Sequence, residues 1–138
     1  MRLDEILTRQ RDRANIGLAT AAEVAALATK IADPGPWGVR DLLDDWRFVA
    51  LRLDGRVALR LLGDSVIATP PWVTSAVVGI NLGTRLVRTT KGSIYRLGQA
   101  GIGEPPERHL RLLAYALIRQ GLGRTFGIHL DRPDDGGS

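Results

Sequence analysis

The centre of the chain, from Arg47 to Leu97, consists of short aliphatic runs separated by turn signals such as Asp54-Gly55 and Lys91-Gly92. Parallel strands need a crossover connection of a dozen or more residues, so connections this short restrict the segment to antiparallel neighbours. Runs of this length with such turn residues are typical of strands. We expect an antiparallel meander with strands at 47–53, 56–62, 65–69, 72–81, 84–90 and 93–97.

Strand 72–81 is long enough to bend across two layers, with a kink at Gly79. We therefore expect residues 47–97 to form a small, strongly bent antiparallel sheet or an SH3-like barrel. A chain of 138 residues accommodates one hydrophobic core. The predicted fold class is α+β, with short N-terminal helices, this sheet, and a C-terminal amphipathic helix packed on it. The predicted domain is 1–132, and 133–138 form a disordered tail.

The predicted hairpin at 47–62 allows two registers. A two-residue loop would place Leu53 opposite Arg56 and would mix apolar and charged side chains on both faces. A three-residue loop collects six aliphatic side chains on one face and turns Arg60 outward, so the hydrophobic pattern favours it. Those side chains belong to Val49, Leu51, Leu53, Val57, Leu59 and Leu61.

Three short helices are predicted before the sheet. Residues 3–14 have apolar positions at helical spacing. Thr20 and Glu23 have the spacing of a capping box, which predicts a second helix that extends to Ile31. A third helix is predicted at 39–46, where the apolar residues share one face. These apolar residues are Val39, Leu42, Leu43 and Trp46.

Helix, break and helix is also the pattern of a helix-turn-helix DNA reader, and residues 20–27 resemble the first helix of excisionase-like winged helices. A recognition helix must approach phosphates, yet residues 39–46 offer only Arg40 against three aspartates. The break at 32–38 is also longer than the turn of that motif. We therefore favour helices that pack their apolar faces on a sheet.

Residues 106–120 predict an amphipathic helix that ends at Gly121. Leu110, Leu113, Ala114, Leu117 and Ile118 form its apolar face, and a short edge strand is predicted at 124–130. The face opposite the apolar one carries Arg108, Arg111, Tyr115 and Arg119. Three guanidinium groups and one aromatic ring on an exposed stripe suit a phosphate backbone or an acidic protein surface, whereas a merely solvated face is the alternative interpretation.

Charge is distributed unevenly along the chain. The net charge is +4, and the segment from Arg85 to Arg124 contains eight basic residues against Glu104 and Glu107, a local balance of +6. Attraction follows the local field, so an anionic partner should meet the second half of the chain. The predicted partner-binding surface is continuous and adds three residues of neighbouring strands to the four of the helix. These three are Arg85, Arg88 and Arg96.

Several function classes are disfavoured by composition. The sequence contains no cysteine, which excludes disulfides, thiolate nucleophiles and cysteine-ligated metals. We expect a cytoplasmic protein without a membrane segment, because the longest run free of polar side chains spans only residues 76–80. The two histidines, His109 and His129, have no metal-ligand spacing, and we expect neither catalysis, nor a metal, nor a cofactor.

The glycines at 98, 101 and 103 follow a strand and precede a helix, as phosphate-binding loops do. Their order differs from the known fingerprints, and Glu104 and Glu107 would repel a phosphate. We therefore interpret the segment as a connection.

The central part of the chain contains five short motifs, which are Asp45-Trp46, Thr74-Ser75, Val87-Arg88-Thr89, Gly92-Ser93 and Tyr95-Arg96-Leu97-Gly98. Together they span about 55 residues and resemble a signature of short uncharacterised proteins of proteobacteria and their mobile elements. The resemblance implies a small bacterial or phage-borne domain with no assigned chemistry.

The sequence thus predicts a non-enzymatic binding or regulatory protein. In the first hypothesis its basic second half contacts nucleic acid or a nucleoprotein complex. In the alternative it is an inhibitor or adaptor of a bacterial or phage system, of the anti-defence type, whose arginines bind an acidic protein surface.

Overall fold

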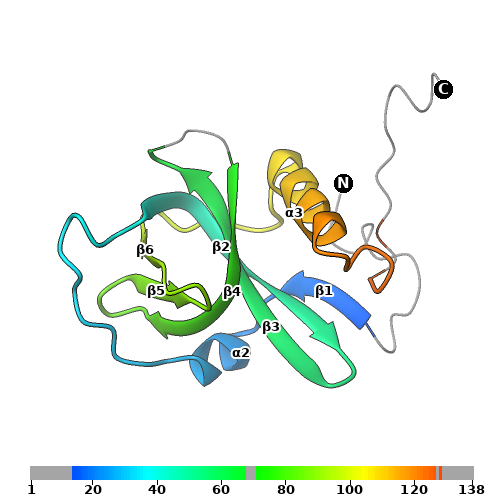
Figure 1. Cartoon of the computed structure of the whole chain (residues 1–138), viewed down its shortest axis with the longest axis horizontal. Coiled ribbons are helices and arrows are strands. Elements are labelled where there is room, and N and C mark those ends of the chain that lie inside the picture. The colour runs from blue at the N-terminus through cyan, green and yellow to red at the C-terminus, as the bar shows by residue number, and fades with distance from the viewer. Residues whose placement is uncertain (1–13, 68–70, 127, 129–138) are drawn as a thin grey trace.

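The computed structural model of the protein describes residues 14–67, 71–126 and 128. In these residues the chain forms a small α+β fold of strands and two helices, as the sequence predicts at that level (Figure 1). The elements in chain order are β1 (Ala14–Leu18), α2 (Ala21–Ala26), β2 (Asp41–Leu53), β3 (Arg56–Ser65), β4 (Pro71–Asn81), β5 (Leu86–Thr89), β6 (Ile94–Leu97) and α3 (Glu107–Arg119). Neither helix is long and apolar enough to cross a membrane.

The six strands of the described residues form one sheet in the order β1-β2-β3-β4-β5-β6, and each strand is antiparallel to its neighbours in this order. β2 makes a further, parallel pairing with β6, where Asp41 lies opposite Tyr95 and Leu43 lies opposite Leu97. The pairing therefore proceeds from β2 through β6 and returns to β2. The predicted strands at 72–81, 84–90 and 93–97 correspond to β4, β5 and β6.

β2 extends over thirteen residues and bends at an irregularity between Asp44 and Arg47. Asp45 lies there with a φ of 50°, in the left-handed region that few residues other than glycine adopt. A bulge of this kind bends a strand and changes which side chains share a face. Leu43 and Phe48, five residues apart, consequently belong to one hydrophobic cluster.

This bulge explains why the predicted helix at 39–46 is wrong. The spacing of Val39, Leu42, Leu43 and Trp46 is that of a helix, but from Asp41 onward these residues lie in β2. A bulge adds one residue to a strand in which buried and exposed side chains alternate, and this shift gives the apolar residues a spacing that resembles that of a helix. The helix-turn-helix alternative required a second helix at 39–46 and is therefore wrong as well.

The hairpin between β2 and β3 has the two-residue turn, so the predicted three-residue loop is wrong. Leu53 lies opposite Arg56, and Asp54 and Gly55 have φ values of 49° and 80°. Two successive residues at positive φ form a type I′ turn, whose twist matches that of the paired strands. The apolar side chains of the hairpin are divided between two faces because both faces are covered.

Each face of the hairpin contributes to its own hydrophobic cluster. The inner cluster contains Phe48, Ala50, Leu59 and Leu61 of the hairpin, together with residues from all the following strands. The α3 cluster contains Val49, Leu51 and Leu62 of the hairpin, β1 and the buried side chains of α3. Arg60, which we expected to point outward, lies on the second face and is buried.

The N-terminal segment is less helical than predicted. Of the predicted helix at 3–14, all but Ala14 lies outside the described residues, and the expected break at Asn15 and Gly17 is part of β1. The capping box of Thr20 and Glu23 is confirmed, but α2 ends at Ala26. The chain then turns to β4, where Thr29 N donates to Ile80 O at 2.9 Å, so pairing with a strand replaces the rest of the predicted helix.

Helix α3 lies against β4 and β3 (Figure 1). Leu110, Leu113, Ala114 and Leu117 are buried in the α3 cluster, whereas Ile118 is 40% exposed and does not belong to the apolar face as predicted. Gly121 follows the C-cap with a φ of 78°, as a C′ glycine does.

The remaining predicted elements are also altered. Residues 124–126 and 128 contain no strand, although Phe126 and Ile128 are buried in the α3 cluster. The predicted strand at 65–69 is absent from its described part, because Ser65 ends β3 and a turn follows. The predicted tail at 133–138 lies outside the described residues.

Two positions of β3, Val57 and Leu59, test the observed register of the hairpin. Leu59 is 2% exposed in the inner cluster, and Val57, on the same strand, is 48% exposed. We expect Leu59→Ala to lower the free energy of unfolding by about 2–5 kcal/mol through the cavity that it leaves. Val57→Ala should lower it by less than about 1 kcal/mol, because the side chain is already half in water. Urea denaturation of both variants checks this, and equal losses would contradict the register.

Candidate functional site

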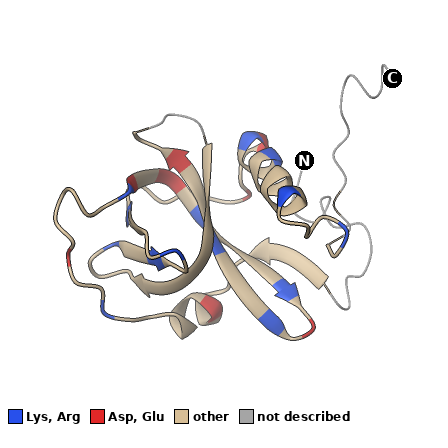
Figure 2. Cartoon of the chain, viewed as in Figure 1, with Lys and Arg blue, Asp and Glu red and all other residues tan. Residues whose placement is uncertain are grey.

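The exposed face of α3 presents three of the predicted partner-binding residues together. Arg111, Tyr115 and Arg119 are spaced by four residues each, which places them on one stripe of the helix. All three side chains are exposed. Figure 2 shows the basic positions along the α3 ribbon, which lies beside the sheet. Within the described part of the chain, neither arginine has an ion-pair partner.

Arg108, the fourth predicted residue of α3, is drawn away from this stripe. Its guanidinium lies 2.6 Å from a carboxylate oxygen of Asp64 and 3.6 Å from one of Asp45. The hydrogen bond to Asp64 raises the pKa of Arg108. Its charge is therefore largely compensated within the protein.

The structure does not bring the three predicted strand arginines beside α3. In Figure 1, β5 and β6 lie on one side of β4 and α3 lies on the other. Arg88 is exposed on β5, and Arg85 donates to the carbonyls of Leu97 and Gly98. Arg96 forms an ion pair of 3.4 Å with Asp33. The predicted continuous surface is thus divided into two separate groups.

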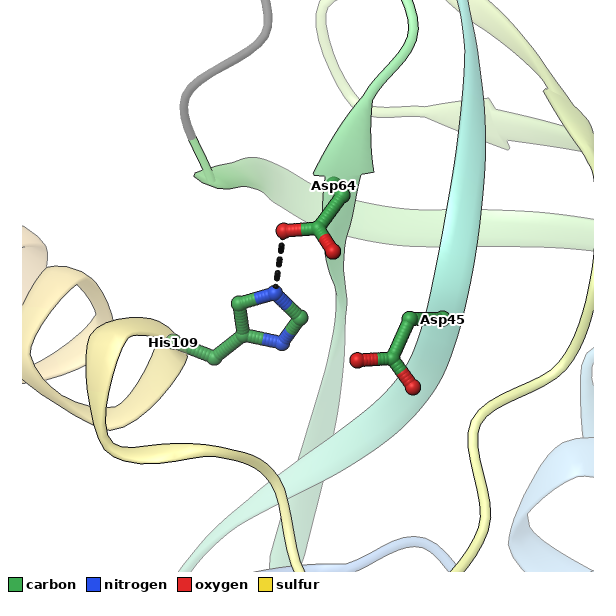
Figure 3. Close-up of side chains that lie close together, drawn as sticks. All are labelled: Asp45, Asp64 and His109. Carbon is green, nitrogen blue, oxygen red and sulfur yellow. Dashed lines mark hydrogen bonds and ion pairs between the residues drawn. The ribbon is translucent and has the colours of Figure 1, made fainter.

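A charged cluster joins the first turn of α3 to the sheet (Figure 3). Its members are Asp45 at the bulge of β2, Asp64 near the end of β3 and His109 of α3. His109 is fully buried, and its Nε2 lies 2.7 Å from Asp64 Oδ1. Because an ionised carboxylate can only accept, Nε2 carries the proton of this hydrogen bond. His109 Nδ1 is buried and has no partner in the described residues.

Two guanidinium groups compensate the two carboxylates of the cluster. Arg108 contacts both aspartates, and Arg47 lies 3.2 Å from Asp45. Arg47 also donates to the carbonyls of Ile102 and Gly103, each at 2.8 Å. The cluster therefore ties β2, β3, α3 and the connection at 98–106 to one another.

The same three residues offer ligand atoms for a metal ion. One donor atom each from Asp45, Asp64 and His109 lies within 4.8 Å of the others, and imidazole with carboxylate suits Zn²⁺. A cation at this place would face the guanidinium of Arg108, which already contacts both carboxylates. The cluster is balanced in charge by the protein's own arginines. We therefore interpret it as an electrostatic clasp that holds α3 against the sheet.

The glycine segment between β6 and α3 is occupied by internal hydrogen bonds. Gly98 N donates to Leu43 O, Gln99 N to a carboxylate oxygen of Asp44, and Gly101 N to Trp46 O. A phosphate-binding loop must point its N–H groups at the ligand. These three point at the protein, which agrees with the interpretation of the segment as a connection.

The sequence held no spacing signal for the clasp. Asp64 and His109 are 45 residues apart, and their proximity depends on how α3 docks on the sheet. In the sequence, His109 lies between Arg108 of the basic face and Leu110 of the apolar face. This position at the border of the two faces was the only sequence feature that pointed to the clasp. Comparison with protein-family models, curated proteins and solved structures finds no match to this chain.

The clasp predicts a pH dependence of stability. Burial raises the pKa of the Asp64 carboxyl, but the hydrogen bonds from Arg108 and His109 outweigh this effect, and the pKa lies below its ordinary value. A carboxyl whose pKa is lower in the folded state stabilises above the unfolded value of about 3.9, and this contribution is lost as the pH falls through the folded pKa.

We expect Asp64→Asn to lower the free energy of unfolding at pH 7 by about 1.5–3 kcal/mol, the range for hydrogen bonds to charged groups. Because the variant lacks the titrating carboxyl, its stability should fall less steeply than that of the wild type below about pH 4. Urea denaturation at several pH values measures both effects. Parallel pH profiles of the two proteins would contradict the clasp.

Proposed function

We propose that the protein is a non-enzymatic, cytoplasmic protein that binds nucleic acid, free or within a nucleoprotein complex, through the exposed face of α3. The observation that supports this proposal best is the stripe of Arg111, Tyr115 and Arg119, whose two guanidinium groups have no acidic partner among the described residues. Exposed, uncompensated guanidinium groups are available for phosphates.

The dimensions of the stripe suit a nucleic acid strand. Arg111 and Arg119 are eight residues apart, which corresponds to about 12 Å along a helix. Phosphates of one strand of duplex DNA follow each other at about 3.4 Å along the axis, so a distance of about 12 Å along the axis corresponds to three or four phosphate-to-phosphate steps. Tyr115 lies between them and offers a ring on which an unpaired base can stack.

Four of the other arginines are already compensated within the protein. Arg47, Arg52, Arg96 and Arg108 all form ion pairs with carboxylates of the described residues. Arg60 is buried, with its Nη2 2.8 Å from Gln120 Oε1 just beyond the end of α3, and has no carboxylate partner there. Burial lowers its pKa, yet an arginine keeps its charge, so Arg60 adds positive potential to the C-terminal end of α3.

We further infer that β2 to β6 close a small, bent barrel of the SH3-like kind. The support for this inference is the parallel pairing of β2 with β6, which returns the strand order to its beginning. α3 lies outside this barrel and buries one face in the α3 cluster, which leaves the opposite face for a partner.

The proposal is tested with the double variant Arg111→Gln/Arg119→Gln. Its affinity for a short duplex DNA at low salt should be more than tenfold weaker, since each lost phosphate contact costs a charge-assisted hydrogen bond of about 1.5–3 kcal/mol. The slope of log affinity against log salt should become shallower by about two. Fluorescence anisotropy at several salt concentrations, with single-stranded DNA and RNA in parallel, measures both quantities.

A matched control removes two exposed cations elsewhere. Lys30 and Arg56 have no ion pair in the described residues, and the variant Lys30→Gln/Arg56→Gln loses the same net charge. It should retain most of the affinity. If no nucleic acid binds at low salt, or if the control and the α3 variant weaken binding equally, the proposal is wrong. Capture of an acidic protein by the wild type but not by the α3 variant would favour the protein-binding alternative.

A further inference from the structure

A candidate site distinct from the α3 stripe lies where β4, β6 and the turn between β5 and β6 meet. A cavity of about 240 Å³ opens there, and it is lined by two cations, one tryptophan, one tyrosine, one threonine, two serines and one valine. These residues are Arg40, Trp72, Val73, Thr74, Ser75, Lys91, Ser93 and Tyr95. We call this cavity the Arg40–Lys91 pocket.

The pocket carries positive charge without an acidic residue in its lining. Arg40 and Lys91 are both exposed, and neither has an ion-pair partner among the described residues. The Arg40 guanidinium carbon lies 5.6 Å from the centroid of the Trp72 ring. This cation–π contact holds the guanidinium at the pocket without compensating its charge.

The remaining polar groups of the pocket are donors or are already used. Trp72 Nε1 donates to the Tyr95 hydroxyl at 3.2 Å, so the Tyr95 hydroxyl hydrogen remains for another acceptor. Thr74 Oγ1 accepts from Leu61 N and donates to Ser75 O, and therefore belongs to the wall. The side-chain hydroxyls of Ser75 and Ser93 have no partner in the described part of the chain.

Size and donor chemistry together define the ligand class. Pockets for drug-sized molecules occupy about 300–1,000 Å³, and this one is smaller. Two cations match a dianion, and three hydroxyls can donate to its oxygens. We propose that the Arg40–Lys91 pocket binds a phosphomonoester dianion, such as the 5′-phosphate of a nucleotide. This proposal does not depend on α3, which contacts nucleic acid in the proposal above.

The residues that line the pocket are distant in the sequence. Thr74 and Ser75 belong to β4, Ser93 precedes β6 and Tyr95 lies within it, so the fold brings them together.

The test uses three probes. They are inorganic phosphate, thymidine 5′-monophosphate, and thymidine as the control that lacks a phosphate. The measurement is tryptophan fluorescence of the full chain carrying Trp37→Phe, because Trp37 is almost fully exposed and Trp72 lines the pocket. We expect saturable binding of thymidine 5′-monophosphate, no binding of thymidine, and binding of inorganic phosphate if the phosphate alone is recognised.

The variant Arg40→Gln/Lys91→Gln should weaken binding of thymidine 5′-monophosphate by more than about tenfold. Both side chains are exposed, so the fold should be retained, and circular dichroism checks this. Ser93→Ala, a milder change, should weaken binding severalfold. Lys30→Gln/Arg56→Gln and Arg111→Gln/Arg119→Gln should leave the affinity for this probe unchanged.

Two outcomes would overturn the phosphate pocket. One is the absence of saturation by either phosphate probe at millimolar concentration. The other is equal affinity of the wild type and the folded Arg40→Gln/Lys91→Gln variant. Because the mononucleotide is too short to engage the whole α3 stripe, failure of the pocket and failure of nucleic acid binding by α3 are observed separately.

Discussion

The structure depends on β2 being buried on both of its faces. Phe48 and Ala50 face the inner cluster, whereas Val49 and Leu51 face the α3 cluster. β2 pairs with β1, β3 and β6. This strand therefore connects the first and last strands of the sheet, and its residues also pack against α3. Such a strand carries a continuous apolar run, because neither face meets water. The bulge at Asp45 allows the two halves of β2 to serve these different partners.

The features that the sequence predicted correctly rest on local signals. The capping box of Thr20 and Glu23, strand 72–81 and the buried leucines of α3 each follow from residues within a few positions of one another. The failures occur where distant contacts decide. The bulge at Asp45 imitates helical spacing in 39–46, and the second hydrophobic cluster makes the apolar residues of the hairpin divide between two faces. The prediction assumed that only one face of the hairpin is buried, whereas both faces are covered.

The candidate site shows the same limit. The α3 stripe of Arg111, Tyr115 and Arg119 could be predicted because helical periodicity alone aligns these residues. The diversion of Arg108 could not, since Asp64 is 44 residues earlier in the chain. Sequence charge counts treat every arginine alike, but the fold pairs several of them with carboxylates. Our two binding proposals therefore rest on arginines that have no ion pair among the described residues, on α3 and at the Arg40–Lys91 pocket, and not on the total charge.

The central claim is that nucleic acid meets the protein on the exposed face of α3. Amide chemical-shift perturbation by NMR, with a short duplex DNA titrated into the full chain, locates the contact directly. The account predicts that the largest changes occur within Glu107–Gln120, around Arg111, Tyr115 and Arg119, while β5 with Arg88 changes little. Perturbations centred on β5 and β6, with α3 unaffected, would contradict it.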